Sequence, residues 1–226
     1  MVRLIDEGAT IPFIARYRKE LHGSMDDQLL RRLADRLQYL RGLAARKEEV
    51  RAAVEGQGKL TEDLSAALDA AATLAEVEDL YRPYKQKRRT RATVAREKGL
   101  EPLAELLFAQ AADGPAPEEA AGAFIDPEKG VETVEAALQG ASDIIAERIS
   151  DDADIRKRLR ELVWKKGSLV SAAAAKEPED TVYRLYYAFR SPLNRVQGHQ
   201  VLAINRGERE GVLKVSVEME REAALI

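Results

Sequence analysis

The amino-acid sequence predicts a mainly α protein, a multi-helix N-terminal region with one β-hairpin near the C-terminal end. Ala, Leu, Glu and Arg dominate and aromatic residues contribute only 5%, a composition typical of helices rather than of β-sandwiches or barrels. After Met25, apolar residues recur mostly at three- and four-residue steps, as on one face of a helix: Leu29, Leu33, Leu37, Leu40, Leu43, Val50 and Val54. Between 213 and 220, apolar and polar residues alternate strictly, which indicates a strand.

Helices separated by short breaks are expected in the N-terminal part of the chain. The breaks contain Gly, Pro or a residue suited to capping the next helix. In order, the expected helices are a single turn at 2–7, a helix from Pro12 to Gly23, a long helix from Met25 to about 54, a short helix opened by Thr61, and one from about Leu74 to Tyr81. Ser24 is the expected N-cap of the long helix, and EGQGK at 55–59 is expected to end it.

The rest of the chain is expected to contain further helices before the hairpin. Pro83 disfavours helical geometry in the residue before it, so KQKRRT should be a loop, with Thr90 or Thr93 capping the next helix. The later helices are expected up to Gly99 and at 100–112, 131–148 and 152–164. ADGPAPEEAAG, which starts at 112, is interpreted as a linker, and the hairpin is placed at about 200–219. Two domains follow from this, 1–112 and 113–226.

The composition excludes several classes of protein. The chain has no Cys, which rules out disulfides, thiolate metal sites and a thiol nucleophile, and which suits a reducing cytoplasm. No signal-peptide core or membrane-length apolar run is present, so we expect a soluble cytoplasmic protein without membrane contact. A formal net charge of −3 gives no overall attraction to nucleic acid, so any such binding requires a local patch of cations.

The segment GQGKLT superficially resembles a phosphate-binding loop. That motif requires Gly where this chain has Ala53, and Ser or Thr where it has Leu60. A turn that ends a helix is therefore the better interpretation of the segment.

No catalytic or metal-binding constellation is apparent. His22 and His199 have no second His or Cys at ligand spacing, so each is assigned a capping or structural role. The pairs Asp26–Asp27 and Asp151–Asp152 lie where helices are expected to start, where the helix dipole favours carboxylates. The sequence therefore predicts no enzyme, no cofactor and no metal site.

The basic run YRPYKQKRRTR, from Tyr81 to Arg91, is the best candidate for contact with an anion. Its last seven residues include five Lys or Arg and no acid. Cations with flanking tyrosines can contact phosphates and stack on bases, but a solvated loop that offsets nearby acidic helices explains the run equally well. The candidate site residues are Lys85, Lys87, Arg88, Arg89 and Arg91, with Tyr81 and Tyr84 packing the loop or stacking on bases.

A second cluster combines aromatic residues with arginine in VYRLYYAFR, from Val182 to Arg190. Aromatic residues at this spacing more often pack a core than stack on bases. We therefore expect this cluster to be structural.

Several long segments resemble the Tex family of bacterial transcription accessory proteins. In chain order they are GATIPFIARYRKE, RLQYLRGL, EGQGKLT, EDLYRPYKQKRRTRATVAREKGLEPLA and HQVLAINRGEREGVLKV. The resemblance covers most of the chain and is weakest between about 112 and 180. The chain departs from the family pattern at Gly198 and Gln200.

The resemblance implies a longer parent protein that binds nucleic acid without enzymatic activity. It implies that this chain is the N-terminal helical part, without about twenty initial residues and cut before an RNase H-like domain, helix-hairpin-helix modules and a C-terminal RNA-binding domain. That both ends interrupt an element agrees with this, because the first helix is too short to be stable alone.

Two functional hypotheses follow. In the first, the chain is a transcription-associated scaffold whose basic loop contacts RNA or DNA independently of sequence. In the second, it is a protein-interaction platform that docks the parent's missing C-terminal domains or the transcription machinery, and the loop cations pair with acidic partners.

Overall fold

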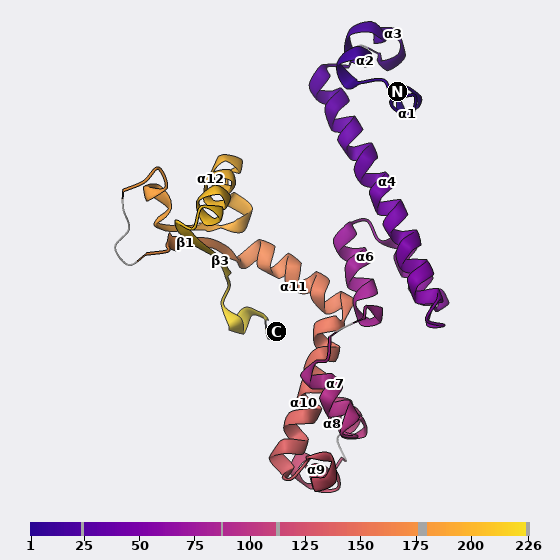
Figure 1. The fold of residues 1–226 in the computed structure, drawn as a ribbon, viewed down its shortest axis with the longest axis vertical. Helices are drawn as coiled ribbons and strands as arrows, with labels where there is room; N and C mark the ends of the chain where they lie inside the picture. The colour runs from indigo at the N-terminus through magenta and orange to yellow at the C-terminus, as the bar shows by residue number, and fades with distance from the viewer. Residues whose placement is uncertain (24, 87, 112–113, 176–179, 225–226) are drawn as a thin grey trace. The chain divides into compact units, whose positions relative to one another are not determined.

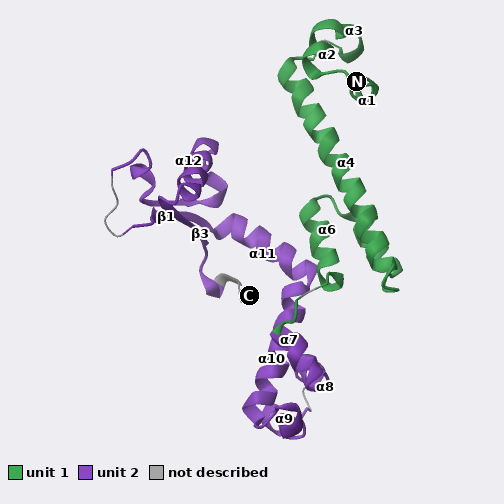
Figure 2. Ribbon diagram, in the orientation of Figure 1, with its two compact units in different colours: residues 1–90 green, residues 91–226 purple. Residues whose placement is uncertain are grey.

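The computed structural model describes residues 1–226 except 24, 87, 112–113, 176–179 and 225–226 (Figure 1). The described chain divides into two compact units, residues 1–90 and 91–226, which Figure 2 colours separately. The predicted domain boundary between 112 and 113 falls on residues outside the described part, and it stays a prediction of domain organisation.

The first unit is helical throughout its regular elements. Its elements are α1 (Val2–Asp6), α2 (Ile11–Tyr17), α3 (Lys19–His22), α4 (Asp27–Glu55), α5 (Glu62–Ala70), α6 (Leu74–Tyr81) and the 3-10 turn η1 (Arg82–Tyr84). The predicted long helix, the helix opened by Thr61 and the helix from Leu74 to Tyr81 are thereby confirmed. The expected N-cap Ser24 lies outside the described residues, whereas Asp26 caps α4 by accepting a hydrogen bond from the Leu29 amide at 2.7 Å.

Two apolar contact regions organise the first unit along α4. Near its start, Ile14 of α2 and Leu30 of α4 are buried. Farther along, one face of α4 packs with α5 and α6 in a cluster of buried residues, namely Leu43, Val50, Val54, Leu64, Leu68, Ala71 and Val77. On α4 the buried members lie seven and four residues apart, on one helix face, whereas Leu29 and Leu40 of the predicted apolar pattern are exposed. The end of this cluster supports the segment that leads into the basic run.

The second unit begins with a group of helices and continues into a small sheet. Its helices are α7 (Arg91–Glu97), α8 (Glu101–Ala109), α9 (Pro117–Gly122), α10 (Val134–Asp151), α11 (Ala153–Lys166) and α12 (Gly198–Arg209). Short 3-10 turns lie at η2 (Pro127–Lys129), η3 (Arg184–Tyr186), η4 (Leu193–Arg195) and η5 (Arg221–Ala224).

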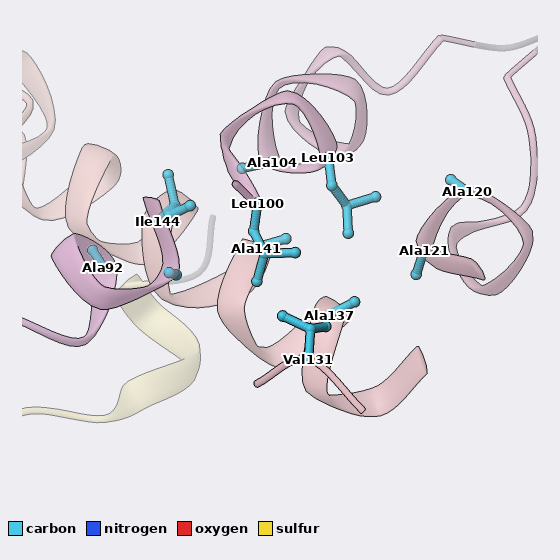
Figure 3. Packing of buried hydrophobic residues seen from close by; sticks show 11 residues of the cluster. Ala92, Leu100, Leu103, Ala104, Ala120, Ala121, Val131, Ala137, Ala141 and Ile144 are labelled. Atoms are coloured by element: carbon cyan, nitrogen blue, oxygen red, sulfur yellow. The ribbon is translucent and has the colours of Figure 1, made fainter. Parts of the chain in front are cut away.

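Helices α7, α8 and α9 pack on α10 around the buried cluster drawn in Figure 3. The cluster includes many alanines, so the helix backbones approach closely. Gly140 of α10 shows this directly, because a Cβ built on it would overlap the Leu100 side chain. The small residue at position 140 is therefore what lets Leu100 lie on α10.

Residues 117–122 correct the linker interpretation. They form α9, with Pro117 in its first turn, where a missing amide hydrogen costs nothing. Ala120 and Ala121 of α9 are buried in the core of the second unit. Pro, Gly and Ala resemble a linker by composition, but here the alanines provide the small apolar face that a tight helix contact requires.

Three antiparallel strands form a sheet in the order β2-β1-β3, with bounds β1 (Ser168–Ala173), β2 (Ala188–Pro192) and β3 (Leu213–Glu218). The central strand β1 pairs its Ser171 with Phe189 of β2 and with Val215 of β3. Helix α12 packs against β3, where a Cβ on Gly207 would press against Leu213 and Tyr183. Glycine at 207 thus allows close contact between helix and strand.

The mainly α prediction, with antiparallel strands near the C-terminal end, is confirmed, and the alternating segment is strand β3. The placement of a hairpin at about 200–219 is wrong, because residues 198–209 form α12. Gln197 and Gln200 form a capping box there, and Ile204 and Gly207 face inward three residues apart. The partner of β3 is β1, which lies far earlier in the chain. Within the described residues, no helix has the length and apolar character needed to cross a membrane.

Candidate nucleic-acid interface

The basic run begins where α6 ends. A capping box between Thr73 and Glu76 fixes the start of α6, which ends at Tyr81. The expectation that Pro83 keeps the residue before it out of helical geometry is wrong, because Arg82 has φ −53° and ψ −42° and begins the 3-10 turn η1. Lys85 then has extended backbone geometry, with its amide donating to the Tyr81 carbonyl at 3.1 Å. The described residues of KQKRRT are not helical, which confirms the predicted loop. The hydrogen bond of the Lys85 amide therefore holds the start of the loop.

Tyr81 and Tyr84 are half-buried and pack against the α4–α5–α6 cluster. The Arg46 guanidinium lies over the Tyr81 ring at 5.6 Å from its centroid, and Gln57 Nε2 donates to the Tyr84 carbonyl at 3.0 Å. Of the two roles predicted for these tyrosines, packing the loop is the one this geometry provides.

The loop cations differ in their surroundings. Lys85 Nζ is 3.9 Å from Glu78 Oε2, and both side chains are exposed, so the pair contributes about 0 to 1 kcal/mol. Arg88 and Arg89 are exposed, and Arg88 has no hydrogen bond or ion pair with any described residue. Lys87 lies outside the described residues. Lys85, Arg88 and Arg89 are thus the described loop cations that face solvent.

Arg91 belongs to the second unit, as the first residue of α7. Its Nε lies 3.7 Å from Asp143 Oδ1 on α10, yet the Arg91 side chain is 86% exposed. The guanidinium can therefore keep this contact and still meet an anion from solvent.

Glu78 is shared between two cations, which weakens its hold on the loop. Arg46 Nε donates to Glu78 Oε1 at 2.6 Å, and Arg46 also donates to Glu49 at 2.9 Å. These hydrogen bonds to two carboxylates raise the pKa of Arg46 above its usual range. Because Arg46 holds Glu78 at 2.6 Å while Lys85 lies 3.9 Å away, Glu78 restrains the Lys85 side chain only weakly.

An exposed group of aromatic and arginine side chains on α2 was missed by sequence reasoning. The rings of Phe13 and Tyr17 lie 5.3 Å apart, with Arg18 over Phe13 at 5.5 Å and Arg16 over Tyr17 at 6.0 Å. Tyr17 is 57% exposed. The alternation RYR at 16–18, where α2 ends, is the available sequence signal. Exposed rings beside guanidinium groups have the composition of a base-stacking surface.

The two histidines and the two aspartate pairs, which the sequence did not assign to a functional site, lie as follows in the structure. His22 is buried at the end of α3, with both ring nitrogens lacking a hydrogen-bond partner among the described residues, and His199 is exposed in the first turn of α12. Asp26 and Asp152 cap α4 and α11, which confirms the helix starts at these two residues. The placement of Asp151 at a helix start is wrong, because it is the buried last residue of α10. The part of the chain that the structure describes brings no three His, Cys, Asp or Glu side chains together as metal ligands.

The segment 182–190 is mainly structural, as expected. Tyr183 is buried against α12, and its hydroxyl donates to Glu210 Oε2 at 2.8 Å. The rings of Tyr186 and Phe189 contact each other at 5.5 Å, and Ser171 Oγ of β1 donates to the Tyr186 carbonyl. These contacts attach the segment to the sheet.

Comparison with known proteins identifies the family of the chain. A family model described as Tex central region-like matches residues 113–225, half of the chain, and one described as Tex-like protein N-terminal domain matches residues 1–55. Two models of one family thus match in chain order. The chain belongs to the Tex family, as its motifs predict.

Individual relatives agree with this assignment. Protein tex of Bordetella pertussis is 45% identical over 98% of this chain, and Transcriptional accessory protein Tex of Neisseria gonorrhoeae is 42% identical over 96%. S1 RNA-binding domain-containing protein 1 of Homo sapiens is 32% identical over 97%. The chain spans 28% of the length of each of the two bacterial proteins and 22% of the human one.

Proposed function

We propose that this chain is a non-catalytic, nucleic-acid-binding scaffold that acts in transcription in the cytoplasm. In this proposal, Lys85, Lys87, Arg88, Arg89 and Arg91 contact the phosphates of RNA or DNA without reading the sequence. The observation that supports it best is the exposed pair Arg88 and Arg89 on a loop whose base is fixed by packed tyrosines. The names of the relatives, one a transcriptional accessory protein and one with an RNA-binding domain, agree with it.

The packing of Tyr81 and Tyr84 assigns them a positioning role in this proposal. Their rings anchor the loop to the cluster, and the cations beyond them provide the contact with the ligand. Because the whole chain has a formal net charge of −3, binding has to rely on such a local concentration of cations.

The exposed rings on α2 provide a second candidate contact. Phosphate contacts alone do not distinguish paired from unpaired strands, whereas exposed rings favour unpaired bases. We therefore propose that Phe13 and Tyr17 stack on bases when the ligand is single-stranded. Arg16 and Arg18 lie over the same rings and add positive charge there.

One titration tests the role of the loop. The change is Lys87→Gln, Arg88→Gln and Arg89→Gln together, and the readout is the fluorescence anisotropy of labelled single-stranded RNA and of duplex DNA. We expect the affinity for both to fall about tenfold or more, because three phosphate contacts are removed. An equal loss of charge at the exposed residues Arg32, Arg158 and Arg195 is the matched control and should change affinity far less.

If the triple variant binds both ligands as the original chain does, the loop is not the interface.

A second candidate function, docking of a protein partner, is favoured by a separate observation. Helix α11 has no buried residue and exposes apolar side chains beside cations.

A further inference from the structure

An apolar groove runs along α11 from the end of α10. One hollow, of about 400 Å³, is lined by Ala146, Ile149, Ser150, Ile155, Arg156 and Leu159. A second, of about 620 Å³, is lined by Arg156, Leu159, Arg160, Glu161, Val163, Trp164 and Leu193. Arg156 and Leu159 line both, so the two hollows are parts of one groove within the second unit.

The apolar residues of this groove form one stripe on α11. Ile155, Leu159 and Val163 follow at four-residue steps, the spacing that places side chains on one helix face. Trp164 extends the stripe and is 60% exposed, and Ile149 at the end of α10 is also exposed. A contiguous exposed apolar surface of this kind marks an interaction site, because isolated proteins seldom leave one uncovered.

Charge determines which partner suits the groove. Helix α11 carries six cations, Arg156, Lys157, Arg158, Arg160, Lys165 and Lys166, against two acids, Asp154 and Glu161. Two of the cations, Arg156 and Arg160, line the groove itself. The side chains that fit are therefore apolar ones flanked by carboxylates.

We propose that the α10–α11 groove docks an acidic amphipathic helix of a partner protein. The stripe from Ile155 to Trp164 covers nine residue steps, which at ~1.5 Å per residue gives a docking surface ~14 Å long. That length matches about two and a half turns of a partner helix, enough for apolar residues at i, i+4 and i+7 with Glu or Asp beside them. The inference is independent of nucleic-acid binding by the loop.

Two other occupants fit less well. A second copy of the chain packed on the same groove would bring two strongly basic helices together, and like charges across an interface are unfavourable. Nucleic acid would pair its phosphates with Arg156 and Arg160, but it would leave the aliphatic stripe of the groove facing a charged backbone instead of an apolar surface.

Trp164 makes the docking directly measurable, because it is the single Trp of the chain and it lines the groove. The probe is a synthetic helical peptide without Trp or Tyr, with Leu at i, i+4 and i+7 and Glu at the flanking positions. Binding should shift the Trp164 emission to shorter wavelength as the ring leaves water. A peptide with Lys in place of each Glu should bind about tenfold more weakly or not at all.

Variants separate the groove from the rest of the helix. Leu159→Glu should weaken binding of the acidic peptide about tenfold or more, and Arg160→Glu about fivefold or more, as for residues central to an interface. Arg158→Glu makes the same charge change but lies two residues from Arg160, so it faces away from the groove and should leave affinity within about twofold. Circular dichroism and the melting temperature of each variant establish that the fold is retained.

The proposal is overturned if the two peptides bind equally, or if neither binds at about 1 mM. It is also overturned if the groove variants bind as the original chain does, or if sedimentation shows a dimer that Leu159→Glu dissociates. Quenching of Trp164 by single-stranded RNA that the acidic peptide does not displace would assign the groove to nucleic acid instead.

Discussion

The Arg46 guanidinium lies over the ring of Tyr81, 5.6 Å from its centroid, and so joins the middle of α4 to the end of α6. The same guanidinium binds Glu78 one turn earlier on α6. The tyrosine that precedes the basic loop is thus held by its ring, and the loop begins from a fixed point.

Replacement of Tyr81 should therefore affect stability through its ring and not through its hydroxyl. Tyr81→Ala should lower the free energy of unfolding by about 2 kcal/mol, because a half-buried aromatic ring and its cation–π contact are lost. Tyr81→Phe keeps both and should change stability by less than about 0.5 kcal/mol, the usual range for surface changes. Urea unfolding followed by circular dichroism measures both variants. A large loss in Tyr81→Phe would contradict the account.

A side chain at position 140 should destabilise the fold, whereas a side chain at position 42 should be tolerated. Gly140→Ala forces a methyl group into Leu100, and we expect a destabilisation of about 1 to 3 kcal/mol from overpacking. Gly42 lies within α4 with open space around the position of a Cβ, so Gly42→Ala should stabilise by about 0.5 to 1 kcal/mol. Thermal unfolding of the two variants checks this pair. Equal effects at both positions would show that helix propensity, not packing, decides the outcome.

The contact between α12 and the segment before β2 should depend on pH at both extremes. Hydrogen bonds from Arg206 and then from Tyr183 lower the pKa of Glu210, so its stabilising contribution is present above the ordinary value of 4.5 and declines as pH falls. Burial, and next the bond to Glu210, raise the pKa of Tyr183, so its contribution is present below 10.0 and declines at higher pH.

Melting temperatures measured from pH 3 to 11 test these two signs. Glu210→Gln should flatten the acid side of the profile, and Tyr183→Phe should flatten the alkaline side, because each removes the group that titrates. Profiles that keep their shape in both variants would mean that other groups determine the pH dependence.

Tyr17 should contribute to the binding of single strands more than of duplexes. Tyr17→Ala should weaken binding of single-stranded RNA by about 1 to 3 kcal/mol, the range for loss of one stacked base, and should leave duplex DNA nearly unchanged. Leu202→Ala, at an exposed apolar residue of α12, is the matched control. Equal losses for the two ligands would argue against stacking on α2.

Helix α6 shows how far local sequence information reaches. Its bounds, Leu74–Tyr81, are those predicted, because a threonine cap and the proline after it define both ends within a few residues. Strand β1 shows the limit. SLVSAA lacks alternation, and it becomes a strand because it pairs on both edges with segments far along the chain. The segment VLAIN at 201–205, within the predicted hairpin, is instead part of α12.

The candidate site likewise has features that local sequence predicts and features that depend on tertiary packing. The position of the basic loop followed from Pro83 and the run of cations, which are local signals. The carboxylate beside Arg91 is Asp143, which lies far away in sequence, and the ring of Tyr81 meets Arg46 from another helix. Such pairings depend on packing between helices, which single-sequence periodicity does not specify.

The salt dependence of nucleic-acid binding tests the central claim most directly. Each phosphate contact contributes about 0.7 to 0.9 to the slope of log affinity against log salt, so loss of Lys87, Arg88 and Arg89 should reduce the slope by about 2 to 3. The control variant at Arg32, Arg158 and Arg195 should keep the original slope. If the loop variant and the original chain show the same slope and the same affinity, the basic loop does not bind nucleic acid.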